Sequence, residues 1–320
     1  MNMKLKQSTD RLIRQLALLG MAGSCLTAVG QDVADLDSGQ PAAAPVQGAQ
    51  HQPSVKVTTA GSYQFNTDIK NGGDFSVARF RAEVGVPISV NDKLSVAPFF
   101  RYGLDSYDFG GGSKPWNDIN SFVTGALLKD RLNENWVVYG GPILRLAAES
   151  GASWSDTLQG GGLLGVTYIM SSELNFGGGL YVMSQVEDNA TVLPIITANW
   201  KFAEHWKAAL GYTDIGTVGY GAMVTWDYQQ DWQLSFGGQF HRSRFRIDGS
   251  GPSNDGIGQE QAFTLATGLT WAPSPSFSAT GFVGLATGGE IRLETSGGNK
   301  LANSNYDPAP VIGLKAVFRF

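Results

Sequence analysis

The chain has 320 residues, a formal net charge of -5, 16% charged residues and 42 glycines, and its mean hydropathy is -0.10. The acidic balance argues against a nucleic-acid-binding protein, because such domains usually carry a basic excess on one face. After residue 30 there is no run of about 18 apolar residues, the length that a membrane-spanning helix needs. The mature chain is therefore not expected to contain a transmembrane helix.

Residues 1–30 have the pattern of a secretory signal peptide. Basic residues between Lys4 and Arg14 precede an apolar stretch from Leu16 to Val29, and cleavage is expected after Gly30. Cys25 is the one cysteine of the sequence and lies in this stretch. Its surroundings resemble a lipoprotein signal only weakly, so an inert signal-peptide residue is the main interpretation and lipidation the alternative.

Residues 31–53 form the second predicted segment. They are rich in Ala, Gln, Gly and Pro and show no periodicity. Such a composition is typical of a disordered segment, here a periplasmic leader. A tether is the simpler role for it, and a hatch that folds into a barrel mouth is the alternative.

Residues 54–320 alternate between apolar and polar in segments of about ten, the length of a tilted strand that crosses a bilayer. In the last segment Ile312 and Leu314 lie on one face, and Lys315 lies on the other. The predicted strands span residues 54–65, 75–90, 94–105, 118–129, 135–147, 158–170, 173–184, 191–202, 206–214, 217–228, 231–246, 260–271, 276–287 and 310–320. Strand edges are not tolerated in lipid, so the strands are expected to close into a barrel.

The connections between these strands alternate in length. Short polar turns precede a large apolar residue, as in Asn133-Glu134-Asn135-Trp136, and longer Gly- and Asp-rich connections include 106–117, 248–258 and 288–308. This asymmetry is typical of a membrane barrel with short periplasmic turns and long extracellular loops. The predicted fold is all-β, a closed antiparallel transmembrane β-barrel of about fourteen strands, within twelve to sixteen. A soluble β domain, which also alternates, is the alternative.

Aromatic residues support this interpretation. Tryptophans on the outward phase beside the short turns are expected to form an interfacial girdle: Trp136, Trp200, Trp206, Trp226, Trp232 and Trp271. The last strand alternates and ends in Phe318-Arg319-Phe320. In these features residues 54–320 resemble porin-like β-barrel proteins of the bacterial cell outer membrane. The resemblance implies that location, and it implies that the barrel assembly machinery reads Phe318 and Phe320 as an assembly signal.

The inward phase carries more basic than acidic residues. The candidates for the lumen lining or a constriction are Arg79, Arg81, Glu83, Arg101, Arg145 and Lys315. A ring of cations concentrates anions and biases a pore toward them. The predicted function is an outer-membrane channel or porin-like transporter that admits small polar solutes, with a bias toward anions, by passive diffusion. In the alternative, arginines and glutamates only satisfy one another, and the protein is a structural or surface-interaction barrel with a closed lumen.

Two smaller groups complete the candidates. Arg242 and Arg244 continue an outward face toward the long loops and are candidates for contacts with lipopolysaccharide phosphates, with solvated rim charge as the alternative. His241 and Ser243 share the inward face and raise lipid hydrolysis as a weaker hypothesis, but the pattern indicates no third orienting group. No calcium loop with spaced ligands appears either. The chain is predicted to be no enzyme, to need no cofactor or metal, and to contact outer-membrane lipids, lipopolysaccharide and small solutes.

Overall fold

The computed structural model describes residues 55–70, 72–111, 114–154, 157–186, 190–215, 218–249 and 255–320. The predicted signal peptide and leader lie outside these residues. The strands are β1 (Lys56–Asp68), β2 (Asp74–Gly85), β3 (Ile88–Ser89), β4 (Leu94–Gly110), β5 (Ile119–Arg131), β6 (Trp136–Glu149), β7 (Gln159–Ile169), β8 (Leu174–Ser184), β9 (Ala190–Ala203), β10 (Trp206–Asp214), β11 (Val218–Gln229), β12 (Trp232–Arg246), β13 (Ile257–Ser274), β14 (Phe277–Glu294), β15 (Lys300–Asn305) and β16 (Ala309–Arg319). All fourteen predicted strands are present, and β3 and β15 are additional short ones.

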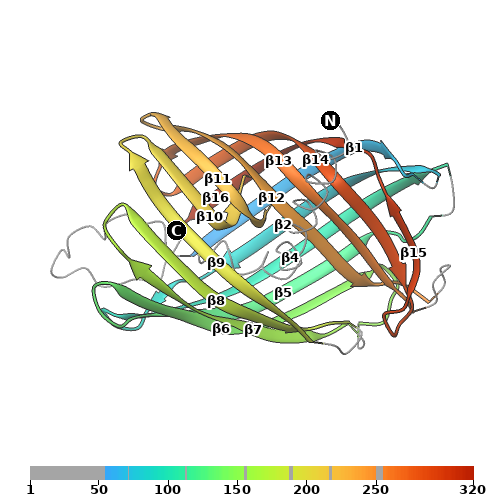
Figure 1. The fold of residues 1–320 in the computed structure, drawn as a ribbon, viewed down its shortest axis with the longest axis horizontal. Helices are drawn as coiled ribbons and strands as arrows, with labels where there is room; N and C mark the ends of the chain where they lie inside the picture. Colours follow the sequence, from blue (N-terminus) through green and yellow to red (C-terminus); the bar gives the residue numbers. More distant parts are fainter. Residues whose placement is uncertain are drawn as a thin grey trace, which may run out of the picture.

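The fourteen long strands close into an antiparallel barrel (Figure 1). Each pairs with its neighbour in the chain, β14 pairs with β16, and β16 returns to pair with β1. At the closing seam the Phe320 amide donates to the Val55 carbonyl at 2.9 Å. An even number of strands puts both ends of the barrel segment on the same side of the membrane. The predicted fold class is confirmed.

The outer surface of the barrel is apolar, and the period of two along each strand produces it. On β2, Phe80 and Val84 are 43% and 41% exposed, whereas Phe75, Val77 and Glu83 on the opposite face are buried. A large apolar exterior of this kind would promote aggregation in water, but it matches the hydrocarbon core of a bilayer. Within the described residues no helix is long and apolar enough to span a membrane.

The long connections are more ordered than the sequence predicted. Residues 288–308 were expected to be a loop, but β14 continues to Glu294 and pairs with β15. Gly288, with φ 62°, stands where the register between β13 and β14 shifts. Beyond it the outward side chains of β14 are Glu290, Arg292 and Glu294, so this end of the sheet faces water rather than lipid. In Figure 1, β15 lies beside β14 at the loop end of the barrel.

Two apolar clusters occupy the inside of the barrel. The outer cluster, near the long loops, consists of Phe75, Val77, Tyr107, Trp116, Ile119, Ala147, Ile215, Phe245, Ile247, Ala262, Ala266, Phe282, Ala286, Ile291, Tyr306 and Val311. The β4–β9 cluster lies against one wall and consists of Ala97, Phe99, Val123, Leu127, Tyr139, Ile143, Leu163, Tyr181, Met183 and Ile195. Above the outer ends of β7 to β11, Arg246 of β12 pairs directly with Ala148 of β6. The barrel is thereby narrowed at its loop end.

Candidate functional site: the barrel lumen

The inside of the barrel holds a fully buried carboxylate, Glu260 of β13. Nη2 of Arg79, from β2, donates to both oxygens of Glu260 at 2.7 Å. The hydroxyls of Tyr107 and Tyr306 donate to the same carboxylate at 2.7 and 3.0 Å. The strands β1, β16 and β14 separate β2 from β13 in the wall, so the ion pair links distant parts of the barrel. Four charge-assisted hydrogen bonds from three side chains fix its geometry.

Two further ion pairs continue this group along the inner wall. Arg81 lies 2.6 Å from Asp105, and Arg101 pairs with Glu83. Glu83 and Arg101 are directly opposite each other on β2 and β4, where cross-strand partners of opposite charge stabilise a sheet. Four of the six predicted lumen residues therefore belong to one group, which we name the ion-pair group: Arg79, Arg81, Arg101, Glu83, Asp105 and Glu260. It contains three arginines and three carboxylates.

The other two predicted lumen residues lie on other strands, β6 and β16. Arg145 is buried on β6, and its guanidinium donates to Gln159 Oε1 at 2.6 Å and to the Arg244 carbonyl at 3.0 Å. Lys315 lies on the inward face of β16, with Ala60 and Thr280 as cross-strand neighbours. The predicted cations thus come from four strands, β2, β4, β6 and β16.

Sequence reasoning missed three residues that form the contacts around the Arg79–Glu260 ion pair: Glu260, Tyr107 and Tyr306. The phase of β13 places Glu260 on the inward side with Ala266, and the phase of β4 does the same for Tyr107 with Arg101. Alternation could therefore have found these two residues. Tyr306 lies after β15, outside the regular strands, and carried no comparable signal.

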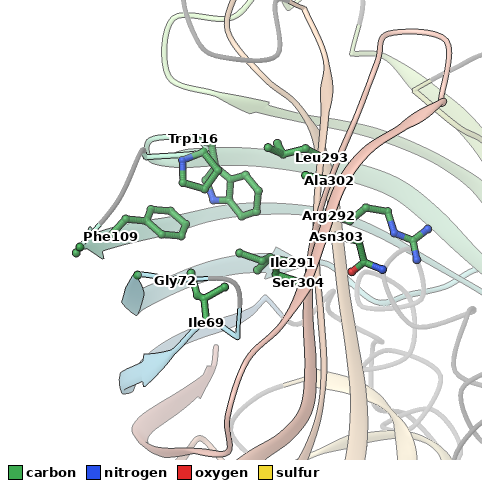
Figure 2. Close-up of a pocket in the computed structure, with 14 residues that line it drawn as sticks. Ile69, Gly72, Phe109, Trp116, Ile291, Arg292, Leu293, Ala302, Asn303 and Ser304 are labelled. Atoms are coloured by element: carbon green, nitrogen blue, oxygen red, sulfur yellow. The ribbon is translucent and has the colours of Figure 1, made fainter.

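A pocket of about 300 Å³ opens at the loop end of the barrel. The side chains of Ile69, Phe109, Trp116 and Ile291 face one another across it, while Arg292 points to the opposite side of the β14–β15 sheet (Figure 2). The other lining residues are Gly72, Gly73, Gly110, Gly111, Pro115, Leu293, Ala302, Asn303 and Ser304. The pocket wall is therefore mainly apolar.

Trp116 closes the bottom of this pocket against the outer cluster. It is 2% exposed and makes edge-on contacts with the rings of Tyr107, Phe109 and Phe245 at 5.6, 5.5 and 5.2 Å. Its indole N–H has no hydrogen-bond acceptor among the described residues.

The remaining predicted residues lie on the outside. The six tryptophans of the predicted girdle are between 36% and 52% exposed and stand at the strand ends beside the short turns. Trp206 and Trp226 stack at 5.5 Å, and Phe318 lies 6.5 Å from Phe320 at the end of the last strand. This edge of the barrel thus carries a band of exposed aromatic side chains.

Arg242 and Arg244 lie on the outward face above the apolar belt. Both donate to Gln259 Oε1, and Arg244 also binds Glu294 at 2.6 Å. Burial alone would raise the pKa of Glu294, but the hydrogen bond from Arg244 and the charges of Arg244 and Arg292 outweigh it and hold this pKa below its usual value. Arg244 is buried, whereas Arg242 is partly exposed.

His241 and Ser243 share the inward face of β12, as the sequence indicated. Nε2 of His241 has no hydrogen-bond partner among the described residues. The described residues also hold no group of three or more side chains that could bind a metal ion.

Comparison with solved structures finds the same kind of fold. A FadL homologue of Pseudomonas aeruginosa aligns over 83% of this chain and 90% of its own, with 9% identity and a TM-score of 0.50. An outer-membrane channel of Pseudomonas putida F1 aligns over 86% and 99%, with 12% identity and a TM-score of 0.46. The toluene transporter TodX of P. putida aligns over 84% and 90%, with 9% identity and a TM-score of 0.44. No protein-family model and no curated protein matches the sequence.

At these identities the likeness concerns the fold alone. Together with the closed barrel, its apolar exterior and its aromatic edge, it defines the class: the chain is a β-barrel of the bacterial outer membrane.

Proposed function

We propose that this barrel is an outer-membrane channel through which small, mainly apolar solutes pass by passive diffusion. The observation that carries the proposal is the pocket at the loop end, where Ile69, Phe109, Trp116 and Ile291 meet. Ligand sites in proteins are typically concave and apolar with a few polar groups that orient the ligand. Here Ser304 in the pocket wall supplies such a group.

The balance of charge in the lumen supports this choice of solute. The sequence predicted polar solutes with a bias toward anions, because the inward arginines outnumber the acids. In the ion-pair group each of the three arginines has a carboxylate partner, so their charges are largely compensated. The reversal potential of the channel in a potassium chloride gradient measures whether an anion preference remains.

Uptake of 1-N-phenylnaphthylamine tests the proposal. Lipopolysaccharide excludes this apolar dye, and it fluoresces once it reaches phospholipid. Bacteria that express the barrel should take up the dye faster than cells without it. Ala302→Phe fills the pocket and should slow uptake, whereas Asn305→Phe, on the same strand β15 but not part of the pocket lining, is the matched control. Uptake equal to that of cells without the barrel would refute an apolar channel.

A barrel with a closed lumen is the second candidate function. The outer cluster and the Arg246–Ala148 pairing between β6 and β12 favour it, because both obstruct the loop end. In that case the long connections bind partners, and no solute crosses the outer membrane through the barrel. Purified protein in planar bilayers would then show no potassium chloride current at any voltage, and expressing cells would take up no dye.

Two contacts at the barrel surface belong to the proposal as well. We infer that Arg242, which is partly exposed above the apolar belt, binds lipopolysaccharide phosphate, with Arg244 holding the local sheet through Glu294. We also infer that Phe318 and Phe320 on the last strand serve barrel assembly. Phe320→Ala should lower the amount of folded barrel in the outer membrane, measured as the heat-modifiable fraction in gel electrophoresis.

A further inference from the structure

The barrel wall is interrupted between β9 and β10. Within the described residues the two strands pair only from Trp206↔Ala203 to Leu210↔Ala198. Beyond Leu210, β10 continues to Asp214 paired with β11 alone, while residues 190–197 of β9 remain paired with β8 on their other side. We name this stretch, residues 190–197 and 211–214, the β9–β10 interruption. One edge of β9 therefore lacks its neighbouring strand.

The chain bends into the barrel after Leu210, over residues 211–215. Gly211 has φ 116°, a conformation that L side chains rarely adopt, and it marks the place where pairing with β9 stops. Four residues later, Ile215 is 1% exposed and belongs to the outer cluster. Its side chain lies against the inward glycines Gly237 of β12 and Gly268 of β13. Ile215 is thus inside the lumen.

The interruption lies within the hydrocarbon region. Ile196 is four residues from Trp200 of the aromatic edge. At about 3.3 Å per residue and a tilt of about 45°, Ile196 lies about 9 Å above that edge, inside an apolar band about 25 Å tall. Its side chain is 49% exposed and faces outward, as does that of Pro194. Lipid therefore reaches a strand edge, where unpaired backbone groups are costly.

The chain compensates for this edge with a side chain and a proline. The hydroxyl of Tyr220, from β11, donates to the Ile196 carbonyl at 2.7 Å and accepts from the Ile196 amide at 3.1 Å. It thus takes the place of a backbone partner. Pro194, two residues away on the same edge, has no amide to satisfy. The Tyr220 hydroxyl thus joins β9 to the β10–β11 hairpin in this stretch.

Apolar side chains stand directly behind the interruption. Ile195, Tyr181 and Met183 of the β4–β9 cluster are buried on the inward side, and Leu193 and Tyr220 pack against that cluster. We propose that the β9–β10 interruption is a side opening through which small apolar solutes pass between the lumen and the lipid, and that Tyr220 holds it closed. This inference rests on the proposed channel function, and it adds the route that the solute takes.

A reversible bridge across the interruption tests the route. Cysteines at positions 196 and 220 (Ile196→Cys with Tyr220→Cys) are joined by a short bis-methanethiosulfonate in cells that express the barrel. The sequence has one other cysteine, Cys25, in the predicted signal peptide. Dye uptake should fall to the level of cells without the barrel when the bridge forms, and a reducing agent should restore it. The matched control is Leu164→Cys with Leu180→Cys, an outward pair on the intact β7–β8 ladder, whose bridging should change nothing.

Removal of the hydroxyl gives an independent readout. Tyr220→Phe keeps the ring but loses both bonds to Ile196, so dye uptake should rise. Tyr102→Phe is the control, because the Tyr102 hydroxyl binds Asn120 in the continuous β4–β5 wall. Unchanged uptake in the bridged and Tyr220→Phe proteins, with the wild type active, would overturn the side opening and leave the channel standing. An inactive wild type would instead remove the channel and the side opening with it.

Discussion

Replacement of Glu260 by glutamine should strongly destabilise the barrel. Glu260 is 0% exposed and accepts hydrogen bonds from Arg79, Tyr107 and Tyr306. Glutamine has nearly the same shape, so packing is preserved. It leaves the Arg79 charge buried without this partner, however, and its amide group points donors at side chains that are themselves donors.

The magnitude follows from the burial of the pair. Removing one partner of a buried ion pair costs about 3–5 kcal/mol, because the remaining charge stays desolvated. The side chains of Arg79 and Glu260 are 12% and 0% exposed, so this range applies. Asp227→Asn offers the control: its partner Lys207 lies 3.0 Å away, but the two side chains are 52% and 33% exposed. Loss of such an exposed pair costs about 1 kcal/mol or less.

Urea unfolding of the barrel in lipid vesicles, followed by tryptophan fluorescence, measures both free energies of unfolding. The reasoning would be refuted if Glu260→Gln fell within about 1 kcal/mol of the wild type, since that is the range of a solvated pair. Joint replacement of Arg79 and Glu260 by leucine should recover part of the loss, because no charge is then left buried.

Three further predictions concern other parts of the barrel. Trp116→Ala should lower the free energy of unfolding by about 3–5 kcal/mol, as expected for a large buried ring, while Trp154→Ala, at a residue that is 41% exposed, should change it little; equal effects in urea unfolding would contradict the assigned burial. Tyr220→Phe should cost about 1–3 kcal/mol, the penalty for leaving the Ile196 backbone groups unpaired, and loss of amide protection at Ile196 in hydrogen exchange checks the cause. Because the pKa of Glu294 is lowered from 4.5, its pair with Arg244 stabilises the fold at neutral pH. This stabilisation is lost as the pH falls below 4.5 and through the lowered pKa of the folded state. The stability difference between wild type and Glu294→Gln should therefore shrink over this pH range, and a constant difference would count against the pair.

The sequence by itself determined the strands, their faces and the class of protein. Alternation with period two and polar turns before large apolar residues are local properties, readable without knowledge of which strands meet. They placed Arg79 and Glu83 inside and Trp136 outside, and the structure has them there. The boundary errors are at the loop end, where β14 continues past 287 because this part of the sheet stands in water and no longer obeys the apolar pattern.

Only the tertiary structure decided what the inward residues do. Arg79 and Glu260 are 181 positions apart, and their contact depends on how the barrel closes and on how far the side chains reach across it. The same holds for Trp116, which enters the outer cluster from a long connection, and for the pairing of β6 with β12. Local patterns carry no information about such distances.

The β9–β10 interruption shows most clearly which features the sequence determined and which only the tertiary structure decided. Pro194 and Gly211 were visible in the sequence as residues that weaken a strand, but alternation continued through both, so each was included in a regular strand. The register break, the inward bend at Ile215 and the Tyr220 hydroxyl on Ile196 appear only when β9, β10 and β11 are placed together. A side chain from one strand replaces the backbone of another, and that exchange depends on three-dimensional proximity rather than on order along the chain.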